Sequence, residues 1–175
     1  MLIEYQFLNT AAIALGYALA KSPDFSYKER ISKLLTDLTI DQKKYFIKIS
    51  DKIGFSLEKN ISDKSKQLSK GLHNHFRNTS MTEDFYEIIV CMLGAEWLYL
   101  TWCSKASSLG KLTSPMKEWI IMHSEGNFVN NVKWLKEEIN NVAAQFTDGR
   151  KNKLQHIFNT TLKEEIKFHN APYHT

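Results

Sequence analysis

The chain has 175 residues, of which 43% are hydrophobic and 24% are charged, and its formal net charge is +4 at pH 7. This length predicts one domain, residues 1–175, that buries its own core. The basic residues are scattered among acids instead of clustering, which argues against a nucleic-acid partner. The two cysteines, Cys91 and Cys103, lie about 18 Å apart on one predicted helix at ~1.5 Å per residue, so reduced thiols in a cytoplasmic protein are expected.

The first helical segment contains an apolar run, FLNTAAIALGYALAK, that invites comparison with a signal peptide. Glu4 precedes this run, and no Lys or Arg does, which argues against a secretory signal. No stretch of the chain reaches ~18 uninterrupted apolar residues, so no membrane-spanning helix is expected.

Few residues interrupt the helical pattern, because the chain has only seven glycines and three prolines. A first helix is predicted to end at about Ser22, before Pro23, and a second to cover about Ser26–Leu38. A capping box, Thr39–Gln42, is expected to start the third.

Further helices are expected over about Asp63–Asn78, from a second capping box at Ser80–Glu83, over MKEWIIMH, over about Glu125–Phe146, and from Asp148-Gly149 to Pro172. Ser114 followed by Pro115 is typical of a helix start, here that of MKEWIIMH. The predicted fold is an all-α helical bundle of about seven to eight helices.

The helix after the second capping box is apolar on all sides, yet it contains a glutamate. One face of it, at helical spacing, carries Phe85, Ile89, Met92, Glu96, Tyr99 and Cys103. A buried carboxylate has to be paired, hydrogen-bonded or held neutral by a raised pKa. Glu96 is therefore interpreted either as a structural ion-pairing residue or as a site carboxylate.

The last helix repeats this pattern on one face, through Leu154, Phe158, Thr161, Glu165 and Phe168. Glu164 lies off this face and is expected to be solvated. Near the N-terminus, Glu4 is followed three residues later by Phe7, a further acid beside an aromatic ring. Interior carboxylates with aromatic neighbours predict a small-molecule pocket, with Phe7 among its binding residues.

Four segments resemble the TenA family of thiaminase II and aminopyrimidine aminohydrolases. The ending EEIKFHNAPY is similar to the family's Glu-x-x-Phe-Trp-x-x-Ala, and LGAEWLYL to its L-P-C-x-W-x-Y. MKEWIIMHSEGNFVNNVKWL resembles W-I-x-x-Y-S-x-x-x-F, and EYQFLNTAAIALGYALAKSP resembles the segment that begins Gln-Asp. The resemblance covers nearly the whole chain and implies a haem-oxygenase-like fold.

The resemblance also implies roles for individual residues. Glu165 falls at the catalytic glutamate, and Phe168 at the ring that packs on the pyrimidine. Tyr99 matches a family tyrosine, and His123 stands where another site tyrosine is usual. Glu4 falls at the pyrimidine-binding aspartate. With Phe7, these residues form the predicted substrate site.

The chain departs from the family pattern at several positions. Ala95 replaces the nucleophilic cysteine, and Cys103 lies too far along the helix from Glu96, at about 10.5 Å, to act in its place. A second TenA class has a glutamate three residues before the tyrosine, and Glu96 stands three residues before Tyr99. His169 replaces the usual tryptophan. The chain begins where the family's second helix would, so the first helix is expected to be absent.

The resemblance implies hydrolysis of aminopyrimidine products of thiamin breakdown to hydroxymethylpyrimidine, for thiamin salvage. Glu165 is expected to act as general acid and Glu96 as general base toward water. It implies no cofactor and no metal, a small pyrimidine as the substrate, and a homotetramer or homodimer.

Two alternatives to this hydrolase remain open. The first is a degenerate family member that binds a pyrimidine or a protein partner without catalysis, which the departures from the pattern favour. The second is a di-iron oxidase, since Glu165 and His169 form an i, i+4 pair of ligand types and His73 and His75 supply further imidazoles.

Overall fold

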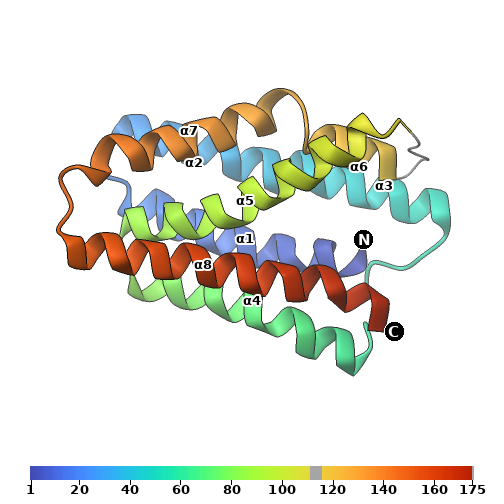
Figure 1. Cartoon of the computed structure of the whole chain (residues 1–175). Coiled ribbons are helices and arrows are strands. Elements are labelled where there is room, and N and C mark those ends of the chain that lie inside the picture. Colours follow the sequence, from blue (N-terminus) through green and yellow to red (C-terminus); the bar gives the residue numbers. More distant parts are fainter. Residues whose placement is uncertain (111–115, 175) are drawn as a thin grey trace. The chain divides into compact units, whose positions relative to one another are not determined.

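The computed structural model describes residues 1–110 and 116–174, which contain eight α-helices and no strand. The α-helices are α1 (Leu2–Lys21), α2 (Phe25–Thr36), α3 (Lys43–Ile53), α4 (Asp63–Thr82), α5 (Phe85–Ser108), α6 (Met116–Met122), α7 (Gly126–Ala143) and α8 (Asp148–Asn170) (Figure 1). A π-helical segment, η1 (Asp37–Gln42), joins α2 to α3, and a 3-10 turn, η2 (Ala171–His174), follows α8. The predicted all-α helical class is confirmed. None of the helices in the described ranges has the length and apolar composition needed to cross a membrane.

The chain divides into two compact units, and the boundary between them falls within α5 and α8. The first unit comprises Met1–Ile88 and Lys163–Thr175, and the second comprises Ile89–Leu162. The predicted site residues are shared between the two units.

In the first unit, α1 contacts α2, η1, α3 and α4. The buried side of α1 carries the small residues Ala14 and Ala18, which are almost fully covered and let neighbouring helices approach closely. Figure 1 shows α1 and α4 running in the same direction, with their C-terminal ends together. The two ends are joined by Lys21.

Lys21 caps the C-terminal end of α4. Its Nζ donates to the carbonyl oxygens of Ser80 at 2.9 Å, Met81 at 3.3 Å and Glu83 at 2.5 Å. Carbonyls in the last turn of a helix lack intrahelical partners and favour a cation. Lys21→Met keeps the aliphatic stem and is expected to lower the free energy of unfolding by ~1–2 kcal/mol. Urea denaturation measures the change, and Lys70→Met at an exposed position of α4 is the control; equal effects of the two would contradict the capping role.

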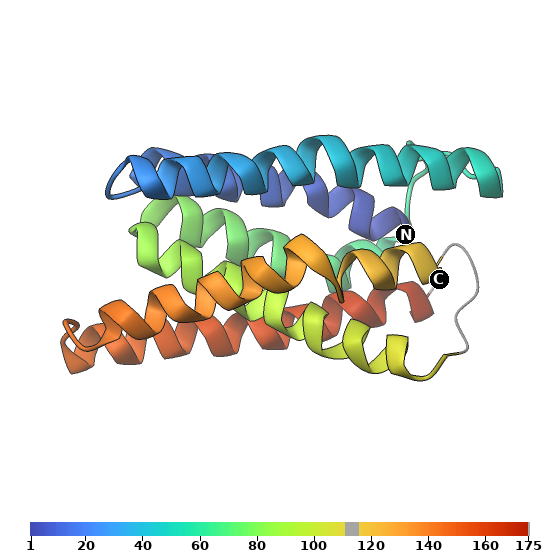
Figure 2. The ribbon, with the colours of Figure 1, turned by 90° about the horizontal axis from the view of Figure 1, so that it is seen from above.

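The predicted capping box at Thr39–Gln42 is wrong. Figure 2 shows α2, η1 and α3 as one continuous helical segment. The hydroxyl of Thr39 donates to the Leu35 carbonyl oxygen at 2.7 Å, so it is satisfied inside the helix instead of capping a new one. Ile31 and Leu38 are both buried, so one apolar face continues from α2 into η1 and keeps the chain helical through this region.

The second predicted capping box, Ser80–Glu83, is also wrong. Ser80 lies inside α4, which extends to Thr82, and its hydroxyl donates to the Phe76 carbonyl oxygen at 2.7 Å. The next helix, α5, begins at Phe85. Observed caps are instead the side chain of Asp24 for α2 and that of Ser62 for α4. The predicted start at Ser114 and Pro115 lies outside the described residues.

In the second unit, α5 and α8 meet closely at Gly94. A Cβ atom at this position would lie 2.8 Å from Thr161 Cβ and 3.0 Å from its Cγ2. Thr161 is fully buried, and its hydroxyl donates to the Ile157 carbonyl oxygen at 3.0 Å. This bond leaves the threonine side chain little freedom to move aside.

Gly94→Ala is therefore expected to lower the free energy of unfolding by ~1–3 kcal/mol, because overpacking forces the helices apart. Gly16→Ala is the matched control, since Gly16 lies within α1 and nothing is found within 4 Å of the place where an added methyl group would lie. That control is expected to be neutral or stabilising by up to ~1 kcal/mol. Thermal or urea unfolding compares the two, and equal stability changes would contradict the close approach.

Candidate functional site

The first unit brings together four of the predicted site residues. Glu4 and Phe7 lie on α1, and Glu165 and Phe168 lie on α8, each pair separated by three residues and thus on one helical face. The rings of Phe7 and Phe168 meet edge to face, with centroids 5.4 Å apart. Glu165 is 2% exposed and Phe168 is 1% exposed, so the last helix does bury a carboxyl beside an aromatic ring, as predicted.

Helix α4 adds two aromatic side chains to this group. The ring of Phe7 lies 5.2 Å from that of His73 and 5.1 Å from that of Phe76, both in edge-to-face geometry. Nδ1 of His73 is hydrogen-bonded to the hydroxyl of Thr10 at 2.7 Å, which links α4 to α1. His73 was predicted only as a candidate metal ligand, and Phe76 was not predicted to lie near the site. Their spacing of three residues, which places them on one face of α4, was the available signal.

His169 lies between the two carboxyl groups of this unit. Its Nδ1 is 3.7 Å from Glu4 Oε1, and its Nε2 is 3.8 Å from Glu165 Oε2. Burial, and secondarily the N-terminal amino group, lowers the pKa of His169 to about 4, so the imidazole is neutral at pH 7. In the sequence, His169 stands out only as a departure from the family pattern and as half of an i, i+4 pair with Glu165.

Glu164 was expected to be solvated, but most of its side chain is covered. Only 18% of the side chain is exposed, and one carboxyl oxygen lies 2.6 Å from Lys167 Nζ. The same carboxyl lies directly over Gly71 of α4, where the absence of a Cβ makes room for it. The contacts of Glu164 are thus with Lys167 and Gly71. Substitution of Glu164 is therefore a useful control for substitution of Glu165.

The second unit holds the other predicted site residues. Tyr99 on α5 and His123 after α6 have ring centroids 5.0 Å apart, and Trp119 and Phe128 also contact the His123 ring, at 4.0 Å and 4.7 Å. Nδ1 of His123 lies 2.8 Å from the Trp119 carbonyl oxygen, so it carries the proton and donates there. Burial lowers the pKa of His123 to about 4. The ring is therefore neutral at pH 7, and its Nε2 is a hydrogen-bond acceptor.

Glu96 lies one turn before Tyr99 on α5. The residue is half-buried, and desolvation of its carboxyl raises the pKa to about 7. A carboxyl group with this pKa is present in both protonation states at neutral pH, which suits proton transfer. Ala95 beside it is buried and has no thiol. Because Glu96 and Glu165 belong to different units, their joint action on one substrate stays a prediction.

In the described ranges, both thiols are buried and no metal centre is found. Both cysteines, Cys91 and Cys103, are buried and free of disulfide bonds. Among residues 1–110 and 116–174, no group of three or more His, Cys, Asp or Glu side chains is arranged to hold a metal ion. The ligand set that the di-iron alternative requires is therefore not assembled in this part of the chain.

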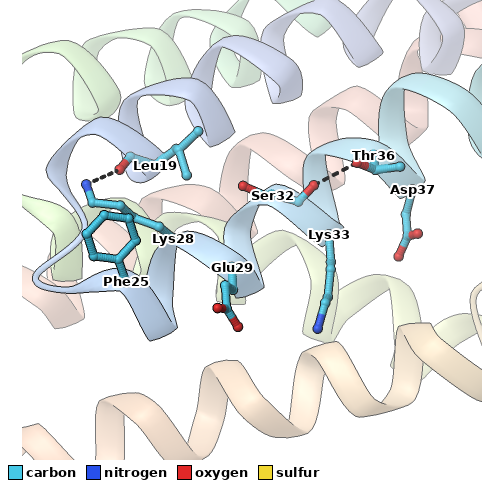
Figure 3. Close-up of a pocket in the computed structure, with 8 residues that line it drawn as sticks. All are labelled: Leu19, Phe25, Lys28, Glu29, Ser32, Lys33, Thr36 and Asp37. Atoms are coloured by element: carbon cyan, nitrogen blue, oxygen red, sulfur yellow. Dashed lines mark hydrogen bonds between the residues drawn. The ribbon is translucent and has the colours of Figure 1, made fainter.

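An open groove of about 650 Å³ runs along α2 in the first unit. Figure 3 shows Glu29 and Lys33 of α2 and Asp37 of η1 extending to the same side, with Phe25 at the start of α2. Lys28 Nζ donates to the Leu19 carbonyl oxygen at 3.2 Å. None of the eight residues drawn in Figure 3 is a predicted site residue, and the groove combines charges of both signs. We therefore place the candidate site at the buried carboxyl groups and not in this groove.

The described residues thus form an all-α fold in which buried carboxyl groups lie on the same helix faces as aromatic rings. Within the all-α class, this chain belongs to the TENA/THI-4/PQQC family, whose profile matches residues 2–174. The family resemblance predicted from the sequence is thereby confirmed.

Two solved structures share the fold. A TenA homologue from Pyrococcus furiosus is 20% identical with a TM-score of 0.86, and the match covers 97% of this chain and 80% of that chain. A TenA homologue protein from P. horikoshii OT3 is 16% identical with a TM-score of 0.80, and the match covers 97% of this chain and 79% of that one. No curated protein matches the chain.

Proposed function

We propose that this chain hydrolyses aminopyrimidine products of thiamin breakdown to hydroxymethylpyrimidine, and that it does so with two carboxyl groups instead of a thiol. Membership of the TENA/THI-4/PQQC family supports this class of activity. The observation that carries the proposal is the nearly complete burial of Glu165 beside Phe168, with Glu4 and Phe7 in the same unit. Burial of a carboxyl group costs folding free energy. Such a group is therefore more often retained where it has a function.

The residues of the first unit would bind the ring and protonate the leaving group. Phe7 and Phe168, whose rings meet edge to face, would pack against the pyrimidine. The Glu4 carboxylate would accept hydrogen bonds from the amino group of the pyrimidine. Glu165 would give its proton to the departing amine as the C–N bond breaks.

The residues of the second unit would activate water and orient the substrate. Glu96, whose pKa is raised to about 7 by burial, would take a proton from water as the new C–O bond forms. Tyr99 and His123 would hold the ring, and His123 would do so as a hydrogen-bond acceptor through Nε2. No covalent enzyme intermediate is required, which agrees with Ala95 in place of a cysteine.

The test is hydrolysis of 4-amino-5-aminomethyl-2-methylpyrimidine by the purified chain, followed by release of ammonia and by chromatography of the pyrimidine product. Turnover above the protein-free reaction is expected. Absence of turnover with binding still detected by calorimetry would contradict the proposal and favour the non-catalytic binding alternative. We also propose that the chain is cytoplasmic and that it forms a homodimer or homotetramer. Sedimentation equilibrium would test the oligomeric state.

A further inference from the structure

The ring of His169 is placed to connect two carboxyl groups that come from opposite ends of the chain. Nδ1 faces Glu4 on α1 at 3.7 Å, and Nε2 faces Glu165, one turn earlier on α8, at 3.8 Å. The two nitrogens of an imidazole are its only polar atoms, and here each is directed to a different carboxyl group. The rings of Phe168 and His169 are in a T-shaped contact, with centroids 5.8 Å apart.

The three groups differ in their access to solvent. Glu165 is 2% exposed, whereas the side chains of Glu4 and His169 are 15% and 27% exposed. A general acid must recover its proton after each turnover, and Glu165 is too deeply buried to recover it readily from bulk water. The imidazole and Glu4 are the more accessible groups beside it.

We propose that His169 relays protons between Glu4 and Glu165, and so restores the proton that Glu165 gives up in catalysis. This inference rests on the proposed role of Glu165 as general acid. The Glu4 carboxylate first takes a proton from solvent hydronium, which leaves water. In the transfer, the Glu4 O–H bond then breaks as Nδ1 gains an N–H bond, and the Nε2–H bond breaks as Glu165 gains an O–H bond. Within the transfer one N–H and one O–H bond are lost and one of each is formed, so the ring ends as the other neutral tautomer. The His169 side chain is 27% exposed, and proton exchange with solvent would return it to the first tautomer before the next turnover.

The groups around His169 support a neutral ring. The charged groups near it include Glu4 on α1, the amino group of Met1 just before α1, and Glu165 on α8. On α4, His73 is hydrogen-bonded to Thr10, and its ring contacts those of Phe7 and Phe168. Burial lowers the pKa of His73. Burial also lowers the pKa of His169, which keeps at pH 7 the neutral form with one donor and one acceptor that a relay needs.

The two distances are longer than hydrogen bonds, so they must shorten by roughly half an ångström or more for proton transfer. Contacts of this length between catalytic groups commonly tighten when substrate binds. A relay therefore predicts that the resonance of each ring nitrogen depends on the carboxyl group beside it. It also predicts that loss of the ring lowers kcat more than it changes KM.

The first arm of the test needs no activity. We would record the ¹⁵N resonances of the His169 ring in the full chain at pH 7, and in Glu4→Gln, Glu165→Gln and Glu164→Gln. Glu4→Gln is expected to move chiefly the Nδ1 resonance and Glu165→Gln chiefly the Nε2 resonance. Glu164→Gln, whose carboxyl pairs with Lys167, is expected to move neither. Unchanged ring resonances in both site variants would overturn the proposal.

The second arm measures hydrolysis by His169→Ala, with His156→Ala at an exposed position of the same helix as its control. We expect kcat to fall roughly 10- to 100-fold with KM within about threefold, and added imidazole to restore part of kcat. A loss confined to KM, or a kcat loss that imidazole does not restore, would overturn the relay. If the ring resonances respond as expected but the intact chain shows no hydrolysis, the contacts of His169 with Glu4 and Glu165 are supported and the proposed hydrolysis is contradicted.

Discussion

Glu165→Gln is expected to lower kcat for aminopyrimidine hydrolysis by roughly 10²- to 10⁴-fold, the usual contribution of a positioned general acid. Glutamine has nearly the same shape and remains able to donate a hydrogen bond, but it has no proton to transfer to the leaving amine. Because the proposed contacts of Phe7 and Phe168 with the pyrimidine would be retained, KM is expected to change only a few-fold. Steady-state kinetics at pH 7 on the purified variant measures both.

Glu164→Gln is the matched control for this variant. It removes the same charge from the adjacent position, but Glu164 faces Gly71 and Lys167 instead of the aromatic rings. It is expected to keep kcat within about threefold of the parent and to cost at most ~1 kcal/mol of stability through the lost ion pair. Equal kcat values for the parent and Glu165→Gln would remove Glu165 from the mechanism, whatever the control shows.

Helical periodicity predicted most of the buried side chains of α8, but Phe158 is only half-buried, and Ile157, which is buried, was not among the predicted residues. A repeat of 3.6 residues puts Glu165 and Phe168 on one face, and that face is buried in the structure. The family resemblance then added roles for these residues that periodicity alone does not contain. The part of the site that lies within one helix was therefore predictable from its own sequence.

The contacts between helices were not predictable in the same way. His73 and Phe76 reach Phe7 only because α4 packs beside α1, and Glu4 reaches His169 only because the first turn of α1 meets the last turns of α8. Such pairings depend on tertiary packing between residues far apart in the sequence. No local pattern specifies them.

The failed capping boxes have a local cause. Ser and Thr hydroxyls bond either to the amide groups that open a helix or to the carbonyl four residues earlier inside one. Ser80 and Thr39 make the second kind of bond. The sequence motif is the same in both cases, and burial of the neighbouring apolar residues decides between them.

Glu96→Gln is expected to make the protein both less active and more stable, and the size of the second effect depends on pH. Burial raises the pKa of Glu96 from 4.5 to about 7, so the folded state favours the neutral carboxyl group. Below pH 4.5 the carboxyl is protonated in both folded and unfolded chains, and burial of a charge costs nothing. As the pH rises from 4.5 to 7, the unfolded chain ionises first, and stability falls.

The full shift corresponds to about 3.5 kcal/mol at about 1.4 kcal/mol per pKa unit, and solvent access to the half-buried side chain reduces it. Glu96→Gln removes this loss because glutamine does not ionise. The variant is therefore expected to match the parent near pH 4.5 and to exceed its free energy of unfolding by ~1–3 kcal/mol at pH 7.5 and above. Urea denaturation at a series of pH values measures the difference, with Glu137→Gln at an exposed position of α7 as the control.

The two interpretations of Glu96 that the sequence left open predict opposite outcomes for this variant. A structural ion-pairing residue would lose its partner on substitution, so Glu96→Gln would destabilise the protein at neutral pH and leave kcat nearly unchanged. A general base would give the reverse, with kcat reduced roughly 10²-fold or more and stability increased above pH 7. Residues that a protein retains at a cost to its stability are those on which its chemistry depends, so a more stable and inactive Glu96→Gln variant would identify Glu96 as part of the catalytic machinery.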